Sequence, residues 1–264
     1  SDVQSMNLAS IVNLHRYALD DTELQVQCRQ QLDKNGALVL DDFLTEDALD
    51  CILAESTKKH SLAYFTQQQH NVYISDADPA FGEEHPRNIL VDSSKGCITD
   101  DLIDEDSPLR LLYNSPLFHT FLCAILGEPE LYPYADTLSS INVHYASEGQ
   151  ELGWHFDNSA FATTLLIQKP EAGGEFQYIG AMQFKENGDR DYDSVGALLQ
   201  GNPEHDPITL AMEPGSLVLF RGHNAIHRVT PVAGSTTRIL VVFAYNTEPG
   251  IALSESARKT FYGR

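Results

Sequence analysis

The spacing of apolar positions divides this chain into a helix-rich first half and a strand-rich second half. At residues 21–33, apolar side chains lie among polar helix formers, and Asn35-Gly36 predicts the end of that helix. The short apolar run at 37–40, Ala-Leu-Val-Leu, follows at once and predicts a buried strand. We expect the first 130 residues to be mostly helical, with this one clear strand.

Two more helices and a long loop complete the prediction for the first half. Thr45 can accept a hydrogen bond from a free backbone N–H group and so begin a helix that extends to about Lys59. An apolar helix is predicted at 116–126 and ends at Gly127. Residues 70–108 are rich in acidic residues, Ser, Pro and Gly, which predicts an irregular loop packed on the body like a lid.

From residue 131 onward, short β-rich runs replace the helical spacing. Turn residues such as Gly173-Gly174 separate them, and a polar excursion at 185–207 contains a predicted short helix at 192–199. Many short strands without alternating helices predict a sandwich or jelly roll closed on itself. The expected strands are 139–146, 161–168, 175–179, 216–220, 225–232 and 238–246.

Composition adds an ordinary core and a strongly acidic balance. Hydrophobic residues make up 42% of the chain, and no apolar run approaches the ~20 residues of a membrane-spanning helix, so we expect no membrane partner. The 17 basic and 38 acidic residues give a formal charge of −21. Such a surface repels phosphate backbones, so we expect no nucleic-acid partner. The acidity favours solubility or, alternatively, a cationic small substrate.

The cysteines and the first residues predict a location. Four cysteines are widely and irregularly spaced, with no Cys-x-x-Cys motif. The sequence begins Ser-Asp-Val-Gln, without the basic start and apolar stretch of a secretory signal. We therefore expect reduced thiols in a cytoplasmic protein. The oligomeric state is left open.

One constellation carries candidate chemistry. His155 and Asp157 are two residues apart, so on a β-strand their side chains point to the same face. His227, in a distant strand-like run, would complete three metal ligands, whereas His223 sits in a Gly-His-Asn turn and is less suitable. Two imidazoles and one carboxylate leave one side of a metal open, as in non-haem Fe(II) oxygenases. Structural zinc would normally require a fourth ligand, often Cys, and no Cys is nearby in sequence.

Arg238 follows His227 by 11 residues and extends the constellation. Its planar guanidinium can bind the far carboxylate of a dicarboxylate cosubstrate whose other end chelates the metal. Alone, Arg238 is an ordinary residue at a strand start, and each histidine is an ordinary polar strand residue. Their combination predicts a metal and cosubstrate site.

Longer motifs surround these residues. They are Gly153-Trp154-His155-Phe156-Asp157, Gly173-Gly174-Glu175-Phe176, Pro214-Gly215-Ser216-Leu217, and His227-Arg228-Val229-Thr230-Pro231-Val232 through Arg238. In order and spacing the chain resembles the Fe(II)/2-oxoglutarate-dependent dioxygenases over about residues 131–250. The resemblance implies a mainly β fold with flanking α: a double-stranded β-helix (jelly roll, cupin-like) core with N-terminal helices. We expect one domain, 1–264, with a helical part and lid at 1–130, the β-helix core at 131–250 and a C-terminal tail at 251–264.

A closer resemblance concerns the substrate. Within that superfamily the chain most resembles amino-acid hydroxylases related to the free-lysine halogenases of the BesD type. The motifs are Tyr134-Ala135-Asp136, Tyr245-Asn246-Thr247-Glu248-Pro249-Gly250, His85-Pro86-Arg87 and Asp106-Ser107-Pro108-Leu109-Arg110. The resemblance implies Fe(II) on His155, Asp157 and His227, with 2-oxoglutarate and O₂ as cosubstrates and a small polar substrate, a free amino acid.

The reaction type depends on one ligand. In the halogenase relatives a small residue replaces the ligand Asp, and chloride takes the vacated iron position. Asp157 is present here. The resemblance therefore implies hydroxylation of an unactivated C–H bond, or a related oxidation such as desaturation or ring formation, and not halogenation.

Further contacts are predicted on weaker grounds. Several superfamily members carry cosubstrate-binding Asn and Tyr residues where this chain has His144 and Ala146. His144 can still form a hydrogen bond to 2-oxoglutarate, and Ala146 cannot. Candidate substrate-binding residues are Arg87 for a carboxylate, Asp136, Asn158 and Asn246 for ammonium groups, and Trp154, which more often packs in a core.

Two other functions stay open. A cupin-like metal protein that does not use 2-oxoglutarate would share the metal ligands but leave Arg238 without a role. An oxygenase acting on a carrier-tethered or peptide substrate would share the whole site, and turnover of free against tethered amino acids would separate it.

Overall fold

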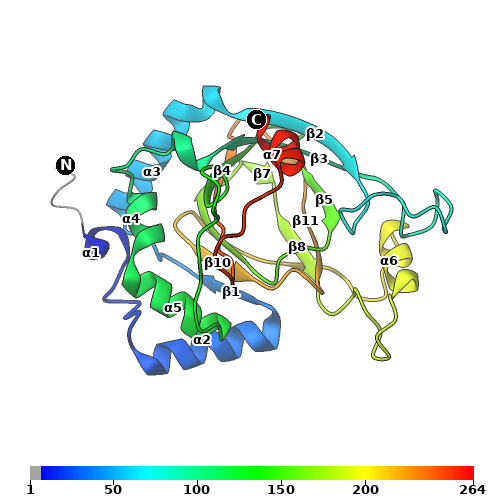
Figure 1. Cartoon of the computed structure of the whole chain (residues 1–264), viewed down its shortest axis with the longest axis horizontal. Coiled ribbons are helices and arrows are strands. Elements are labelled where there is room, and N and C mark those ends of the chain that lie inside the picture. Colours follow the sequence, from blue (N-terminus) through cyan, green and yellow to red (C-terminus); the bar gives the residue numbers. More distant parts are fainter. Residues whose placement is uncertain (1–6) are drawn as a thin grey trace.

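Most strands join in one curled antiparallel sheet in the computed structural model, which describes residues 7–264 (Figure 1). They are β1 (Ala37–Leu40), β2 (Tyr64–His70), β3 (Val91–Ile98), β4 (Ile141–Ala146), β5 (Leu152–His155), β6 (Ala162–Gln168), β7 (Ala172–Gly173), β8 (Phe176–Ile179), β9 (Ile208–Thr209), β10 (Leu217–Phe220), β11 (Ile226–Val229), β12 (Val232–Ala233) and β13 (Arg238–Phe243). The sheet order is β1-β10-β6-β13-β4-β3-β5-β11-β8-β9; β2 pairs with β3, and β7 with β12 apart from the sheet. The expected mainly β fold class is confirmed.

The helices flank this sheet. They are α1 (Leu8–Ile11), α2 (Thr22–Asn35), α3 (Glu46–Lys59), α4 (Pro108–Asn114), α5 (Pro116–Leu126), α6 (Tyr192–Leu199) and α7 (Glu255–Tyr262), with 3₁₀ turns at His60–Leu62 and Asp100–Leu102. Figure 1 shows α2 to α5 together at one end of the sheet and α6 at the other. The predicted ends hold: the Thr45 side chain accepts a hydrogen bond from Ala48 N (3.2 Å), and Gly127 has a φ of 71° after α5.

Along the central strands, successive side chains alternate between the hydrophobic core on one face of the sheet and a cavity on the other. On β13, Ile239, Val241 and Phe243 are buried in the main hydrophobic core beneath the helices. The intervening Arg238, Leu240 and Val242 line a cavity inside the curl of the sheet. Successive side chains of a strand point to opposite faces, so the sheet packs the helices on one side and forms a pocket on the other.

Two strands of the first half were not expected. Residues 64–70 and 91–98 form β2 and β3, and β3 lies in the sheet beside β4 and β5. The expectation of one strand before residue 130, and of an irregular 70–108, was therefore wrong in these segments. The sequences Tyr-Phe-Thr-Gln-Gln-Gln-His and Val-Asp-Ser-Ser-Lys-Gly-Cys-Ile lack apolar alternation because the polar side chains of Thr66, Gln68, Ser93 and Lys95 line the cavity inside the sheet.

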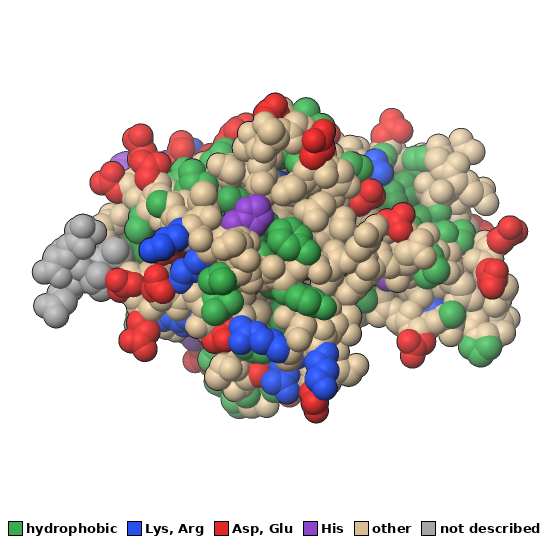
Figure 2. All heavy atoms as spheres, turned by 90° about the horizontal axis from the view of Figure 1, so that it is seen from above, with side chains coloured by type: hydrophobic (Ala, Val, Ile, Leu, Met, Phe, Trp, Pro, Cys, Tyr) green, Lys and Arg blue, Asp and Glu red, His purple; other side chains and the backbone are tan. Residues whose placement is uncertain are grey.

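The last features of the fold are the distribution of charge on the surface and the length of its apolar helices. On the face shown in Figure 2, acidic side chains are scattered around the margin, and Lys and Arg side chains lie in separate groups at the left and at the lower edge. Among the described residues, no single helix is long and apolar enough to cross a membrane. Only α4 and α5 taken together reach that length and composition, as a pair bent by 57°.

Tyr145 links the sheet to the end of α3. Its side chain is fully buried, its ring stacks on His60 with centroids 4.5 Å apart, and its hydroxyl donates to the carbonyl of Ser56 (2.6 Å). Carbonyls in the last turn of a helix lack partners within the helix. We expect Tyr145→Phe to lower the free energy of unfolding by about 1–3 kcal/mol, measured by urea unfolding, because that carbonyl then stays buried and unpaired. Tyr64→Phe at an exposed position is the control, and equal midpoints for the two variants would contradict this role.

Candidate metal centre and cosubstrate pocket

Strand register brings the two predicted histidines together. On β5 and β11, His155 and His227 are direct partners across the antiparallel pair. Directly opposed side chains of such a pair lie on the same face of the sheet. Asp157 lies two residues beyond β5's last residue, and its backbone N–H donates to the Gly222 carbonyl (3.0 Å), which fixes the turn. The carboxylate thus reaches the histidines from a loop and not from a strand position.

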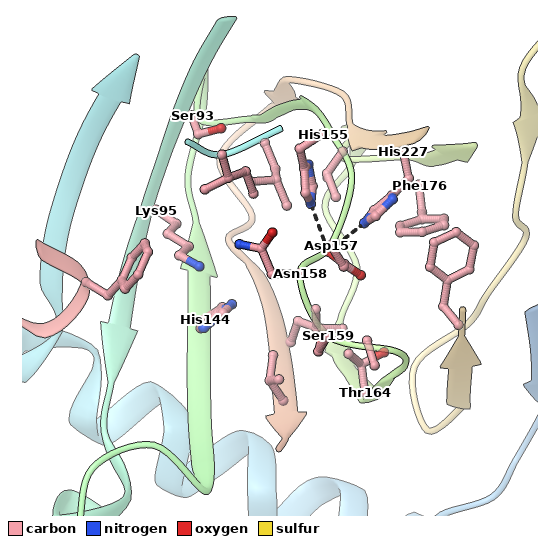
Figure 3. A pocket seen from close by; sticks show the side chains of 18 of the residues that line it. Ser93, Lys95, His144, His155, Asp157, Asn158, Ser159, Thr164, Phe176 and His227 are labelled. Carbon is pink, nitrogen blue, oxygen red and sulfur yellow. Dashed lines mark hydrogen bonds and ion pairs between the residues drawn. The ribbon is translucent and has the colours of Figure 1, made fainter. Parts of the chain in front are cut away.

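The donor atoms of these three side chains converge (Figure 3). Nδ1 of His155 lies 2.8 Å from the Gly153 carbonyl, and Nδ1 of His227 lies 2.8 Å from the Ala225 carbonyl. Nδ1 must carry the proton in each contact, because a carbonyl only accepts, so Nε2 of a neutral ring has a lone pair. Both Nε2 atoms face Asp157 Oδ1, at 3.3 Å and 3.1 Å. Three acceptors facing one another require a cation, and two imidazoles with one carboxylate suit Fe(II).

Burial and mutual contact set the protonation states. Burial lowers the pKa of His155, and nearby His227 lowers it further, while contacts with Asp157 partly oppose the shift. Burial alone would raise the pKa of Asp157, but hydrogen bonds and charge interactions with the two histidines outweigh it and hold the pKa below its usual value. A neutral His155 beside an ionised Asp157 is the state that binds a divalent metal.

Gly222 leaves the space that these ligands occupy. A Cβ at this position would lie 2.1 Å from Asp157 Oδ2 and 2.8 Å from His227 Cε1. Its φ lies outside the left-handed region, so alanine would not strain the backbone itself. The close contact must instead displace one of the two side chains.

Gly222→Ala is therefore expected to weaken Fe(II) binding by about 10–100-fold, the effect of displacing groups that orient metal ligands. Anaerobic Fe(II) titration would measure this, and thermal unfolding would show the fold intact. Gly180→Ala, where an added Cβ meets nothing within 4 Å, is the matched control. Equal Fe(II) affinity in the two variants would place the metal elsewhere.

Arg238 lines the same cavity inside the sheet as the three metal ligands. This cavity has a volume of about 460 Å³, within the range of about 300–1,000 Å³ typical of small-molecule sites. Arg238 is 7% exposed, and no carboxylate of the described residues lies within ion-pair distance of it. Burial lowers its pKa to about 10, so it stays charged at neutral pH. A buried cation without a partner is costly, which points to an anionic ligand.

His144 lines the cavity between Arg238 and β3. Burial, with the nearby charges of Lys95 and Arg238, holds its pKa well below the usual 6.5. His144 is therefore neutral at pH 7 and has one donor and one acceptor available. Its predicted contact with the cosubstrate stays a prediction.

The candidate substrate residues are dispersed. Asn158 lines the cavity next to Asp157 (Figure 3), whereas the other four lie outside its lining. Trp154 precedes His155 on β5, belongs to a separate buried cluster, and packs against the Arg228 guanidinium, 4.6 Å from the ring centroid. Arg87 lies over the Tyr73 ring at 5.6 Å.

Asp136 and Asn246, the remaining two, lie outside the cavity lining. The Asp136 carboxylate accepts hydrogen bonds from the N–H groups of Leu138, Ser139 and Leu253, at 2.9, 2.9 and 3.0 Å. Asn246 pairs with Tyr132 through reciprocal backbone hydrogen bonds of 2.7 Å. The Asp136 side chain therefore has a local structural contact, the Asn246 pairing involves only its main chain, and the structure brings neither residue to the pocket.

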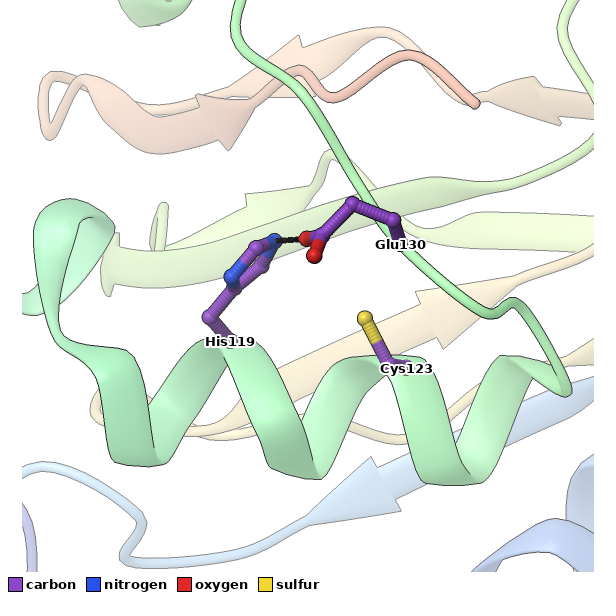
Figure 4. Close-up of side chains that lie close together, drawn as sticks. All are labelled: His119, Cys123 and Glu130. Carbon is purple, nitrogen blue, oxygen red and sulfur yellow. Dashed lines mark ion pairs between the residues drawn. The ribbon is translucent and has the colours of Figure 1, made fainter. Parts of the chain in front are cut away.

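A second group of metal-binding residue types consists of His119 and Cys123 on α5 and Glu130 on the segment that follows it (Figure 4). His119 Nε2 is 2.7 Å from the Leu131 carbonyl and 3.1 Å from Glu130 Oε1. Burial and nearby Glu130 raise the pKa of the Cys123 thiol, and a protonated thiol is a poor ligand. With its Nε2 already engaged, His119 ties α5 to the segment before β4, so we place the metal centre at His155, Asp157 and His227.

Lys95 was missed from the sequence. It lies on β3, lines the cavity, and is partly buried. No local sequence motif identifies Lys95 as a pocket residue. Its position follows only from the pairing of the polar strand β3 with β4. The rejected candidate His223 is exposed, and its Nδ1 faces the backbone carbonyl of Asp157 (3.1 Å), away from the metal ligands' meeting point.

Solved structures with the same fold are distant in sequence. An oxidoreductase of the 2OG-Fe(II) oxygenase family from Burkholderia pseudomallei is 14% identical, with 86% of this chain and 92% of that chain covered and a TM-score of 0.52. The epimerase SnoN from nogalamycin biosynthesis, solved with Fe³⁺, α-ketoglutarate and nogalamycin RO, is 13% identical, with 85% and 84% covered and a TM-score of 0.58. A Pseudomonas putida prolyl-4-hydroxylase is 13% identical, with 83% and 98% covered and a TM-score of 0.50.

The sequence itself gives a family. No curated protein shows a significant sequence match. The model of the family described as Halogenase D matches residues 20–260, nearly the whole chain and all of the metal-centre residues. The likeness in fold confirms the expected jelly-roll architecture. The family match, taken together with this fold, supports the expected Fe(II)/2-oxoglutarate oxygenase superfamily. The chain belongs to the halogenase D family of these oxygenases.

Proposed function

We propose that this chain is an Fe(II)/2-oxoglutarate-dependent oxygenase that hydroxylates an unactivated C–H bond of a small polar substrate, a free amino acid. One observation carries the proposal: three converging metal ligands and an unpaired buried arginine share one cavity. The metal ligands alone would suit a cupin-like protein. Arg238 supplies the charge that a dicarboxylate cosubstrate requires.

The protein's own contribution is placement. His155, Asp157 and His227 would hold Fe(II), and the Arg238 guanidinium would bind the far carboxylate of 2-oxoglutarate. Bound there, iron would supply the chemistry that couples O₂ and 2-oxoglutarate to oxidation of a C–H bond. Phe176, Phe220 and Leu240 line the cavity with apolar surface, which limits water around the reacting groups.

Asp157 supports hydroxylation over halogenation. Its carboxylate lies against both histidines and would occupy the metal position that chloride needs. The fold itself does not select a reaction, since the structural neighbours include an epimerase, prolyl hydroxylases and a carbocyclase. The ligand set is therefore the stronger argument.

The test uses binding first and turnover second. Anaerobic Fe(II) titration with 2-oxoglutarate should give a weak visible charge-transfer band. Admission of air should then release succinate in the presence of one member of a panel of free amino acids, with a product heavier by one oxygen atom. Iron binding without the band, and with 2-oxoglutarate left intact, would refute the proposal in favour of a cupin-like protein.

A further inference from the structure

A second cation of the cavity has no role in the oxygenase proposed above. Lys95 is on β3, one residue before Gly96, which pairs with Tyr145 of β4. The next position in this register is Ala146, whose partner on the other side is Arg238 of β13. Facing residues of antiparallel strands share one face, so Lys95 and Arg238 flank Ala146 on the pocket face, with Cα atoms roughly 10 Å apart across two strand spacings.

The ammonium group of Lys95 has no acidic partner. No carboxylate of the described residues lies within ion-pair distance of it. Burial lowers its pKa, although Cys97 and Asp157 partly oppose the shift. Figure 3 shows its side chain pointing toward His144 and Asn158, at the side of the cavity away from His227. These two neighbours are neutral, and the one carboxylate among the described lining residues, Asp157, belongs to the metal ligands.

The charges in the cavity indicate the charge of the substrate that would balance them. Asp157 is the only carboxylate among its described lining residues, and Lys95 and Arg238 are the only Lys or Arg side chains. A divalent metal with Asp157, Lys95 and Arg238 carries a net charge of +3, and the dianion 2-oxoglutarate reduces this to +1. In a cavity of low dielectric constant the remaining charge favours a ligand with one negative charge.

We propose that the ammonium group of Lys95 binds a carboxylate of the substrate, and that the pocket takes a small substrate of net charge −1, such as an acidic amino acid. The proposal rests on the oxygenase function and refines its substrate class. It assigns to Lys95 the role predicted for Arg87, which packs on Tyr73 outside the cavity. Dibasic amino acids would leave a charge of +2 in the site and find no free carboxylate among the described lining residues.

The experiment compares matched ligands on the protein loaded anaerobically with Fe(II) and 2-oxoglutarate. Calorimetry and the change in the visible band would measure binding of L-aspartate, L-glutamate, their amides L-asparagine and L-glutamine, L-lysine and L-ornithine. We expect one acidic amino acid to bind at least about tenfold more tightly than its isosteric amide, the effect of a lost charge-assisted contact. The two dibasic amino acids should bind most weakly.

Variants then assign the effect to Lys95. Lys95→Met should leave the band with 2-oxoglutarate unchanged and remove the preference for the acidic ligand, and Lys95→Arg should restore part of it. Lys34→Met, at an exposed position on α2, is the control.

Each other outcome overturns the proposal. A band lost in Lys95→Met would make Lys95 a cosubstrate ligand. Binding of none of the six amino acids, or equal binding of an acid and its amide, would refute the substrate class. In each of these cases the wild-type protein would still show the visible charge-transfer band with Fe(II) and 2-oxoglutarate, and the oxygenase function would stand. A wild-type protein without this band would refute the oxygenase function itself.

Discussion

Replacing Arg238 with methionine is expected to weaken 2-oxoglutarate binding by at least about 10²-fold, because one member of a buried charge pair is removed. The visible band of the iron complex should be lost at cosubstrate concentrations that saturate the wild type. Fe(II) affinity without 2-oxoglutarate should change little, because Arg238 lies on β13 and the metal ligands lie on β5, β11 and the loop after β5.

The same variant should be more stable without ligands. Arg238 is buried and lacks an acidic partner among the described residues, so its charge costs free energy in the ligand-free fold. Thermal unfolding should therefore show a higher midpoint for Arg238→Met while its affinity falls. Arg238→Lys keeps the positive charge but loses the bidentate guanidinium, so this variant should still bind 2-oxoglutarate weakly. Lower stability together with unchanged 2-oxoglutarate affinity would show a structural role instead.

The elements that could be predicted from sequence are those with strong local signals. The helix ends at Thr45 and Gly127 are marked by side-chain and backbone chemistry within a few residues. The strands of the second half are marked by apolar alternation and turn residues. The grouping of His155, Asp157 and His227 was predictable because two of them are only two residues apart in sequence and the third lies in a clear strand.

The features that could not be predicted from the sequence are mainly those that line the pocket. β2 and β3 carry polar residues on the face that lines the cavity, so their sequences resemble loops, and Lys95 was missed with them. Trp154 could have been excluded from the metal-facing side by strand alternation alone, because it neighbours His155 on β5. Asp136 and Asn246 were chosen by residue type, and neither lines the pocket. The Asp136 carboxylate accepts from neighbouring backbone N–H groups, which no residue pattern shows.

Asp157→Gly should convert the ligand set to that expected of the halogenase relatives. Hydroxylated product should fall by at least about 10³-fold, since the metal's contribution of several kcal/mol to catalysis depends on intact coordination. The structure also shows where an anion would fit. Asp157 Oδ1 lies 3.3 Å from His155 Nε2 and 3.1 Å from His227 Nε2, so removing the carboxylate leaves its space open beside the two nitrogen atoms.

Chloride should occupy that space, because it restores the negative charge that the substitution removes from a site with two neutral imidazoles. We expect the visible band of Asp157→Gly to shift with added chloride, and product carrying one chlorine atom to form only when chloride is present. Asp157→Asn is the matched control, since its side chain keeps the volume and blocks the space. If Asp157→Gly binds Fe(II) and 2-oxoglutarate but its spectrum is indifferent to chloride, the carboxylate is not what separates this chain from halogenation, and other residues around the metal must exclude the anion.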